Sequence, residues 1–174
     1  MFPKTFDMVL IAERFEESIV MLRKALCWTQ EDMSYLKLNA RQQGGNKSPP
    51  LSEAARRALR EWLRADFMLY EHFRKKLDDL VAGVGDGRMA KERENLSRTN
   101  KMVRDKCVIE EAEYSKLPRI YRNWGTGVAG YRVNETADPM CKYYTIGEIP
   151  FLDELRAKQA RRAWGEMAEG RRKV

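Results

Sequence analysis

The sequence predicts an α/β protein that is predominantly α-helical, with one or two parallel strands among long helices. An apolar run rich in strand-forming residues, residues 6–12, directly precedes an amphipathic segment with helical spacing. Farther along the chain, two long stretches that begin near Ser52 and Arg88 are rich in helix-favouring residues. A strand followed by a helix is half of a βαβ unit, so a neighbouring strand is expected to be parallel.

The first predicted helix begins shortly after Glu13, the acidic residue at the end of the predicted strand. Its apolar stripe, at i, i+4, i+7 and i+11, consists of Phe15, Ile19, Leu22 and Leu26. Residues 28–38 are ambiguous, with Asp32 as the end of a short turn and residues 34–38 as a possible second strand. Residues 42–50 are predicted to be a loop, because glycine, asparagine and proline are concentrated there.

A long helical stretch is predicted to begin at Ser52, whose side chain suits an N-cap. Its apolar stripe consists of Leu59, Trp62, Leu69, Phe73, Leu77 and Leu80. Asp66 fills the gap in that stripe, and a carboxylate facing a core needs a partner or a break in the helix. The simpler interpretation is a break, with Asp66 capping a second helix; the alternative is a catalytic carboxylate.

The last third of the chain changes character twice. Residues 88–113 are charged and favour a helix with a thin apolar stripe, which is expected to lie on the surface. After Pro118 the sequence is rich in aromatic residues and glycine, which predicts irregular structure. A short basic helix is expected over residues 151–169. We therefore divide the chain into a domain over residues 1–117 and a tail over residues 118–174.

Composition and charge narrow the class of protein. The chain has 174 residues, of which 43% are hydrophobic and 34% charged, as in an ordinary soluble globular domain. Its net charge of +7 favours anionic partners such as nucleic acid, lipid headgroups or phosphate- and sulfate-bearing ligands, or simply gives a solvated basic face. No run of 18 apolar residues occurs, and no secretory signal is recognised.

The cysteines argue against a metal centre. Cys27, Cys107 and Cys141 form no CxxC pair, and the sole histidine, His72, is expected to be a packed or surface residue. We therefore expect no metal.

Three phrases of the sequence resemble the galactose 3-O-sulfotransferase family, in the same order and spacing. The first is FDMVLIAERFEES, continuing to Leu26-Cys27-Trp28; the second runs from Glu31-Asp32 to Leu38-Asn39-Ala40-Arg41; the third is Asp66 through Leu69-Tyr70-Glu71-His72-Phe73. Together they span about residues 5–110 and correspond to the C-terminal half of the family's domain. Past Pro118 no family motif is recognised.

This resemblance implies a P-loop-like fold with a parallel sheet. It also implies a Golgi membrane protein whose catalytic domain lies on the luminal side. It also implies transfer of a sulfuryl group from 3′-phosphoadenosine 5′-phosphosulfate to the 3-hydroxyl of galactose, on a glycolipid such as galactosylceramide or on a glycan. The family's donor loop and its catalytic base precede everything matched here, so the chain is expected to be a fragment, and membrane association is expected only through an anchor outside it.

Asn39, Arg41 and Glu13 are the candidate residues for contact with substrate or donor. They follow the two predicted strands, and loops at the carboxyl ends of strands line the sites of open α/β sheets. The guanidinium of Arg41 suits a phosphate or sulfate group because its donors bind in a bidentate fork. The alternative is that these are ordinary surface residues at loop edges.

The implied compartment adds two expectations. Cys27 and Cys107 fall where the resemblance places cysteines and are expected to form a disulfide in an oxidising lumen. Asn95 and Asn134 begin N-x-[ST] triplets, as does Asn46, and so are expected N-glycosylation sites.

Three functions are therefore compared. The first is a sulfotransferase, and the second is a non-catalytic glycan-binding or regulatory module derived from one. The third is an unrelated basic protein that binds nucleic acid or membrane, which only the net charge favours, since no nucleic-acid signature occurs. Because an unpaired strand exposes an apolar edge, the chain expressed alone is expected to aggregate or to fold poorly.

Overall fold

The structure is a computed structural model that describes residues 6–38, 49–122 and 129–171. The chain forms two compact units, Met1–Ser34 with Asn46–Met102, and Tyr35–Gly45 with Val103–Val174. The described residues are mostly helical, and a two-stranded antiparallel sheet is the sole sheet among them.

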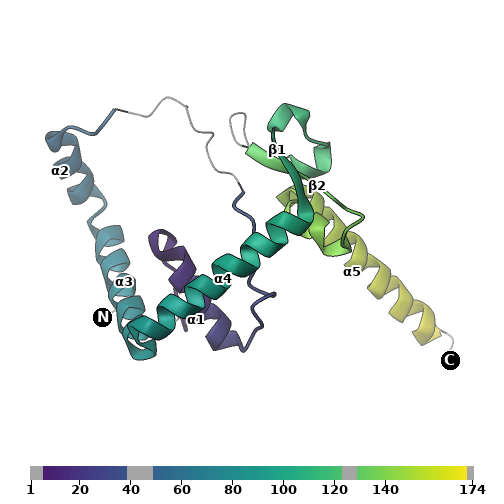
Figure 1. Cartoon of the computed structure of the whole chain (residues 1–174), viewed down its shortest axis with the longest axis horizontal. Coiled ribbons are helices and arrows are strands. Elements are labelled where there is room, and N and C mark those ends of the chain that lie inside the picture. The colour runs from purple at the N-terminus through teal and green to yellow at the C-terminus, as the bar shows by residue number, and fades with distance from the viewer. Residues whose placement is uncertain (1–5, 39–48, 123–128, 172–174) are drawn as a thin grey trace. The chain divides into compact units, whose positions relative to one another are not determined.

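The first unit is built from helices (Figure 1). They are the 3-10 helix η1 (Ala12–Arg14), α1 (Phe15–Leu26), α2 (Glu53–Trp62), α3 (Arg64–Val84) and most of α4 (Asp86–Cys107). α1 confirms the predicted first helix and contacts α3. Ser18, Ile19, Val20 and Met21 are its buried residues. The helix is followed by Cys27, whose φ of 53° places it in the left-handed region.

The predicted strand over residues 6–12 is wrong, because these residues adopt no strand and lead into η1. The run is nevertheless partly buried, and Ile11 exposes only 4% of its surface. The Ser18 hydroxyl satisfies the backbone of Ile11, which removes the need for a neighbouring strand. Residues 34–38 form no strand either, so the predicted parallel sheet is absent from the described part of the chain.

The helical stretch after residue 52 begins as predicted. The Ser52 hydroxyl accepts a 3.2 Å hydrogen bond from the backbone N–H of Ala55, as an N-cap should. The break between α2 and α3 falls at Leu63, so Asp66 lies in the first turn of α3 rather than at its cap. Its negative charge still favours that helix end.

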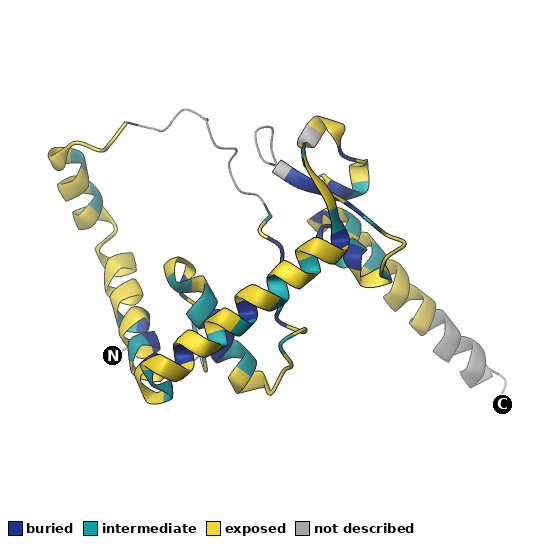
Figure 2. Ribbon diagram, in the orientation of Figure 1, coloured by how far each residue is buried: buried dark blue, intermediate teal, exposed yellow. Residues whose placement is uncertain are grey.

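α3 is buried along only part of its length. Phe73, Leu77 and Val81, one turn apart, are its buried residues. Toward the N-terminus the stripe continues through Leu69, which is exposed. Most of the first half of α3 is exposed as well (Figure 2). The same helix face is thus covered in its second half and bare in its first.

α4 ends at Cys107 and β1 begins at the next residue, so the end of the helix predicted over residues 88–113 falls six residues too late. The helix lies on the surface as predicted, with most of its residues exposed, and its thin apolar stripe packs inward. Met89, Leu96 and Cys107 each expose 3% or less of their surface.

The second unit contains the sheet. β1 (Val108–Glu113) pairs antiparallel with β2 (Ala129–Val133), with Glu111 opposite Tyr131. The remaining elements are the 3-10 helices η2 (Tyr114–Lys116), η3 (Arg119–Tyr121) and η4 (Pro139–Tyr144), and the helix α5 (Glu148–Arg171). α5 confirms a last helix and begins three residues earlier than predicted.

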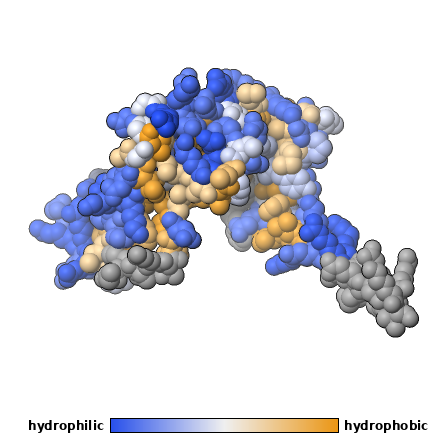
Figure 3. Space-filling view, turned by 90° about the horizontal axis from the view of Figure 1, so that it is seen from below, coloured by the Kyte–Doolittle hydropathy of each residue, from blue (hydrophilic) through white to orange (hydrophobic). Residues whose placement is uncertain are grey.

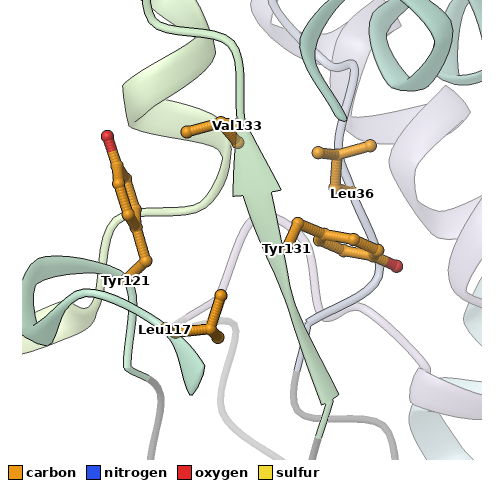
Figure 4. Close-up of a cluster of buried hydrophobic side chains, with 5 residues drawn as sticks. All are labelled: Leu36, Leu117, Tyr121, Tyr131 and Val133. Atoms are coloured by element: carbon orange, nitrogen blue, oxygen red, sulfur yellow. The ribbon is translucent and has the colours of Figure 1, made fainter. Parts of the chain in front are cut away.

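A small core organises the second unit around β2 (Figure 4). Its buried members are Leu36, Leu117, Tyr121, Tyr131 and Val133. Leu36 belongs to the extended segment after the turn at residues 31–33, so that segment packs here although it joins no sheet.

The drawn surface is mainly hydrophilic, with hydrophobic areas between the charged side chains (Figure 3). Among the described residues, no helix is both long and apolar enough to cross a membrane.

Candidate functional site

The turn that carries Glu13 is held by a buried serine. Ser18 is fully buried, and its Oγ accepts a 3.0 Å hydrogen bond from the Ile11 N–H while donating to the Ile11 carbonyl at 3.2 Å. One hydroxyl thus fixes both backbone groups of the residue that precedes η1. The path of the chain into Glu13 is therefore set by α1 itself.

Arg14 holds the same turn to α3. Its guanidinium donates to the carboxylates of Glu17, on α1, and Asp78, on α3. The bond to Glu17, followed by the contact with Asp78, raises the pKa of Arg14 above its ordinary value. The side chain therefore stays charged and bridges two helices of the first unit.

Glu13 lies between these anchors and is exposed. It makes no ion pair with the residues that the structure describes. The carboxylate is therefore open to solvent on a fixed turn, where it is available to hydrogen-bond a hydroxyl of a ligand.

Asn39 and Arg41 lie outside the described residues, but the segment that leads to them is anchored. Leu36 is buried in the core of the second unit, and the Lys37 carbonyl accepts a 3.1 Å hydrogen bond from the Tyr131 hydroxyl. Arg104 also donates to that hydroxyl, at 3.2 Å, and lies 5.1 Å from the centre of the Tyr131 ring. The chain is thus held until two residues before Asn39.

The helix N-termini do not suit a phosphate. An acidic residue occupies the first turn of every α-helix whose start the structure describes. These residues are Glu16 and Glu17, Glu53, Asp66, Asp86, and Glu148. A carboxylate there competes with an anionic ligand for the N–H groups and for the positive end of the helix dipole. These helices therefore lack the usual cradle for the phosphates of a nucleotide.

No cluster of three or more His, Cys, Asp or Glu side chains that could hold a metal occurs in the described part of the chain. His72 is half-buried, and its ring packs edge-on against Phe73 with centroids 5.1 Å apart. This packing fits the expectation of a structural histidine.

Comparison with known proteins decides the family. The model of the galactose-3-O-sulfotransferase family matches residues 2–159. The chain is 40% identical to galactosylceramide sulfotransferase of Bos taurus, over 87% of the chain, and 37% identical to that of Homo sapiens, over 88%. The chain belongs to the galactose-3-O-sulfotransferase family. It spans 38% of the length of these two relatives, and no solved structure matches it significantly.

The family match continues past Pro118, where recognisable sequence motifs end. It therefore includes β2, η4 and the first half of α5. Galactose-3-O-sulfotransferase 2 of Homo sapiens is also similar, at 29% identity over 90% of the chain and 42% of its own length.

Several residues in the family-like phrases have structural roles. Ser18 clamps the turn at Ile11, and Phe73 is buried on α3. The Asp32 carboxylate accepts hydrogen bonds from the N–H and the hydroxyl of Thr29, which lower its pKa and close a turn. These residues position the chain, and Glu13, Asn39 and Arg41 stay the predicted candidates for contact with ligand.

The disulfide prediction is wrong in its pairing. Cys107 bonds to Cys141, with Cα atoms 5.1 Å apart, whereas Cys27 is an exposed free thiol. Pairing cannot be read from spacing alone when three cysteines are present. The sequence analysis therefore missed Cys141 as the partner of Cys107, and no signal in the sequence distinguished it from Cys27.

Proposed function

We propose that this chain forms part of a sulfotransferase that moves a sulfuryl group from 3′-phosphoadenosine 5′-phosphosulfate to the 3-hydroxyl of galactose on a glycolipid or glycan. The observation that carries the proposal is the family match over residues 2–159, with relatives that are named for this activity. The proposed location is the luminal side of the Golgi membrane, and the disulfide is consistent with such an oxidising compartment.

In this proposal the donor's phosphates are bound by residues outside the part of the domain described here. The acidic first turns of the described helices support that division, because each repels an anion. Sulfuryl transfer depends on positioning the donor and on a base for the acceptor hydroxyl. The matched segment then helps to position the substrates. The rest of the domain supplies the P-loop-like parallel sheet.

Arg41 is proposed to bind an anionic oxygen of the donor, and Asn39 and Glu13 to bind hydroxyls of the acceptor sugar. A guanidinium offers paired donors to a sulfate or phosphate group. The anchoring of Leu36 and Lys37 supports this assignment, because a ligand-binding segment must be held by a rigid scaffold.

The test is a chimera in which residues 2–159 replace the matched segment of bovine galactosylceramide sulfotransferase. Transfer of labelled sulfate to galactosylceramide and to a galactose-terminated glycan is measured, with the unmodified bovine enzyme as reference. We expect a product sulfated at the 3-hydroxyl of galactose. A folded, Golgi-localised chimera that transfers no sulfate to either acceptor contradicts the proposal.

A second function is a non-catalytic glycan-binding or regulatory module. The acidic first turns of the described helices favour it, because each repels an anionic donor. It predicts that the inactive chimera, or the chain alone, still binds galactose-terminated glycans on an array.

A further inference from the structure

The turn after β2 presents an asparagine in a defined conformation. Asn134 is half-buried, and its backbone N–H donates a 2.8 Å hydrogen bond to the carbonyl of Cys107. The Ala137 N–H closes the turn with a 3.3 Å bond to the Asn134 carbonyl. Because Cys107 is itself bonded to Cys141, the start of this turn is fixed by the covalent framework of the second unit.

The carboxamide of Asn134 is oriented by the residue two positions later. Its Oδ1 accepts 2.7 Å from the Thr136 hydroxyl and 3.3 Å from the Thr136 N–H. The oxygen is therefore engaged, while no described residue accepts a hydrogen bond from Nδ2. Glu135 lies between Asn134 and Thr136 in the sequence and is exposed. Its carboxylate accepts a 2.5 Å hydrogen bond from the Tyr121 hydroxyl, which connects the turn to η3.

Asn134 begins an N-x-[ST] triplet, and the two other such triplets of the chain begin at Asn95 and Asn46. Asn95 lies in the interior of α4, where its Oδ1 accepts a 2.6 Å bond from Arg98 and its carbonyl accepts from the Thr99 hydroxyl. Asn46 lies outside the described residues. A bulky glycan is accommodated on a surface turn, whereas helix backbone and neighbouring side chains crowd a helical asparagine.

We infer that Asn134 is an N-glycosylation site and that Asn95 is not. The inference rests on the luminal location that belongs to the proposed function. In the reaction the Nδ2 atom of Asn134 bonds to the anomeric carbon of a lipid-diphosphate-linked oligosaccharide. The bond from that carbon to the phosphate oxygen breaks, the lipid diphosphate leaves, and Nδ2 loses one proton.

The test translates the full chain behind a heterologous signal peptide in the presence of endoplasmic-reticulum microsomes. Glycosylation is read as a mobility shift that peptide N-glycosidase removes. In a chain that carries Asn46→Gln, we expect one glycan, none when Asn134→Gln or Thr136→Ala is added, and one when Asn95→Gln or Thr136→Ser is added. Thr136→Ser keeps the acceptor triplet, so its glycan separates loss of the site in Thr136→Ala from a defect in folding.

Two results would overturn the inference. One is a chain without a glycan although its signal peptide has been cleaved. The other is a glycan that survives Asn134→Gln. The signal peptide supplies the compartment, so the result does not depend on sulfotransferase activity; an inactive chimera would overturn the proposed function and leave this site standing.

Discussion

Cys107 and Cys141 form a disulfide that joins the end of α4 to η4, across 34 residues of sequence. The loop that it closes contains both strands of the sheet and most of the core of the second unit. Both cysteines are almost completely buried, at 2% and 0% exposure. The bond therefore holds the two ends of this loop together covalently.

The disulfide predicts which thiols react. In unreduced, denatured protein, one thiol per chain, that of Cys27, should be labelled by a maleimide, and three after reduction. Cys141→Ser should lower the free energy of unfolding by about 3–4 kcal/mol, because a loop of this length loses its cross-link. Cys27→Ser is the control and should leave stability unchanged. Three labelled thiols without reductant would show that the bond does not form.

The hydrogen bonds between the Ser18 hydroxyl and the backbone of Ile11 predict that removal of this hydroxyl lowers stability. Ser18→Ala leaves the buried N–H of Ile11 without its partner and should cost about 1–3 kcal/mol, measured by urea denaturation. Ser97→Ala on the exposed side of α4 is the matched control and should change stability by less than about 0.5 kcal/mol. Equal effects of the two substitutions would remove the clamp's proposed role.

The docking of α5 predicts a dependence on pH. Lys142, in η4, donates to the Glu154 carboxylate on α5, and this bond lowers the pKa of Glu154 below its ordinary value of 4.5. Since the folded-state pKa is the lower one, the pair stabilises the fold above pH 4.5. That contribution is lost as pH falls through the lowered pKa. A hydrogen bond from Tyr143 and the positive charge of Lys158 also lower the pKa of Glu154.

We therefore expect the melting temperature of the parent chain to fall more steeply below about pH 4.5 than that of Glu154→Gln. Circular dichroism melts between about pH 3 and pH 7 measure this difference. Asp153→Asn, whose partner Arg156 is exposed on the same helix, should keep the parent's profile. Parallel curves for the parent and Glu154→Gln would exclude a role for this bond in acid sensitivity.

The helices could be predicted from the sequence because their signals are local. Ser52 was identified as an N-cap from its residue type and position alone, and its hydroxyl does bond to Ala55. The first helix followed from the spacing of Phe15 and Ile19, and the last from composition.

The strands could not be predicted because an apolar run indicates burial and not the partner of its backbone. At Ile11 that partner is the side chain of Ser18. The sequence of β1 is VIEEAE, which has neither a run nor an alternation of apolar residues. An ion pair between Glu110 on β1 and Arg132 on β2 connects the two strands. Of the candidate site, Glu13 lies on a fixed, exposed turn, whereas Asn39 and Arg41 lie beyond the described residues and stay a prediction.

The exposed apolar side chains around the α2–α3 junction predict self-association of the isolated chain. Trp62 exposes 82% of its surface, and Phe67 and Leu69 expose 44% and 43%. Trp62→Arg with Phe67→Gln should reduce the apparent mass in light scattering at high concentration, with no loss of melting temperature. Met102→Arg, at an exposed methionine on α4, is the control. A monomeric parent chain would contradict the prediction.

The central claim is that this chain supplies substrate contacts to a sulfotransferase, and Arg41 tests it most directly. In the active chimera, the KM for 3′-phosphoadenosine 5′-phosphosulfate is compared between Arg41→Ala and Arg57→Ala, the latter at an exposed arginine of α2. The account predicts that Arg41→Ala raises this KM at least about tenfold, as expected when a charged hydrogen bond is lost, with an unchanged melting temperature. Arg57→Ala should have no effect. Equal KM values in the two variants would contradict the claim.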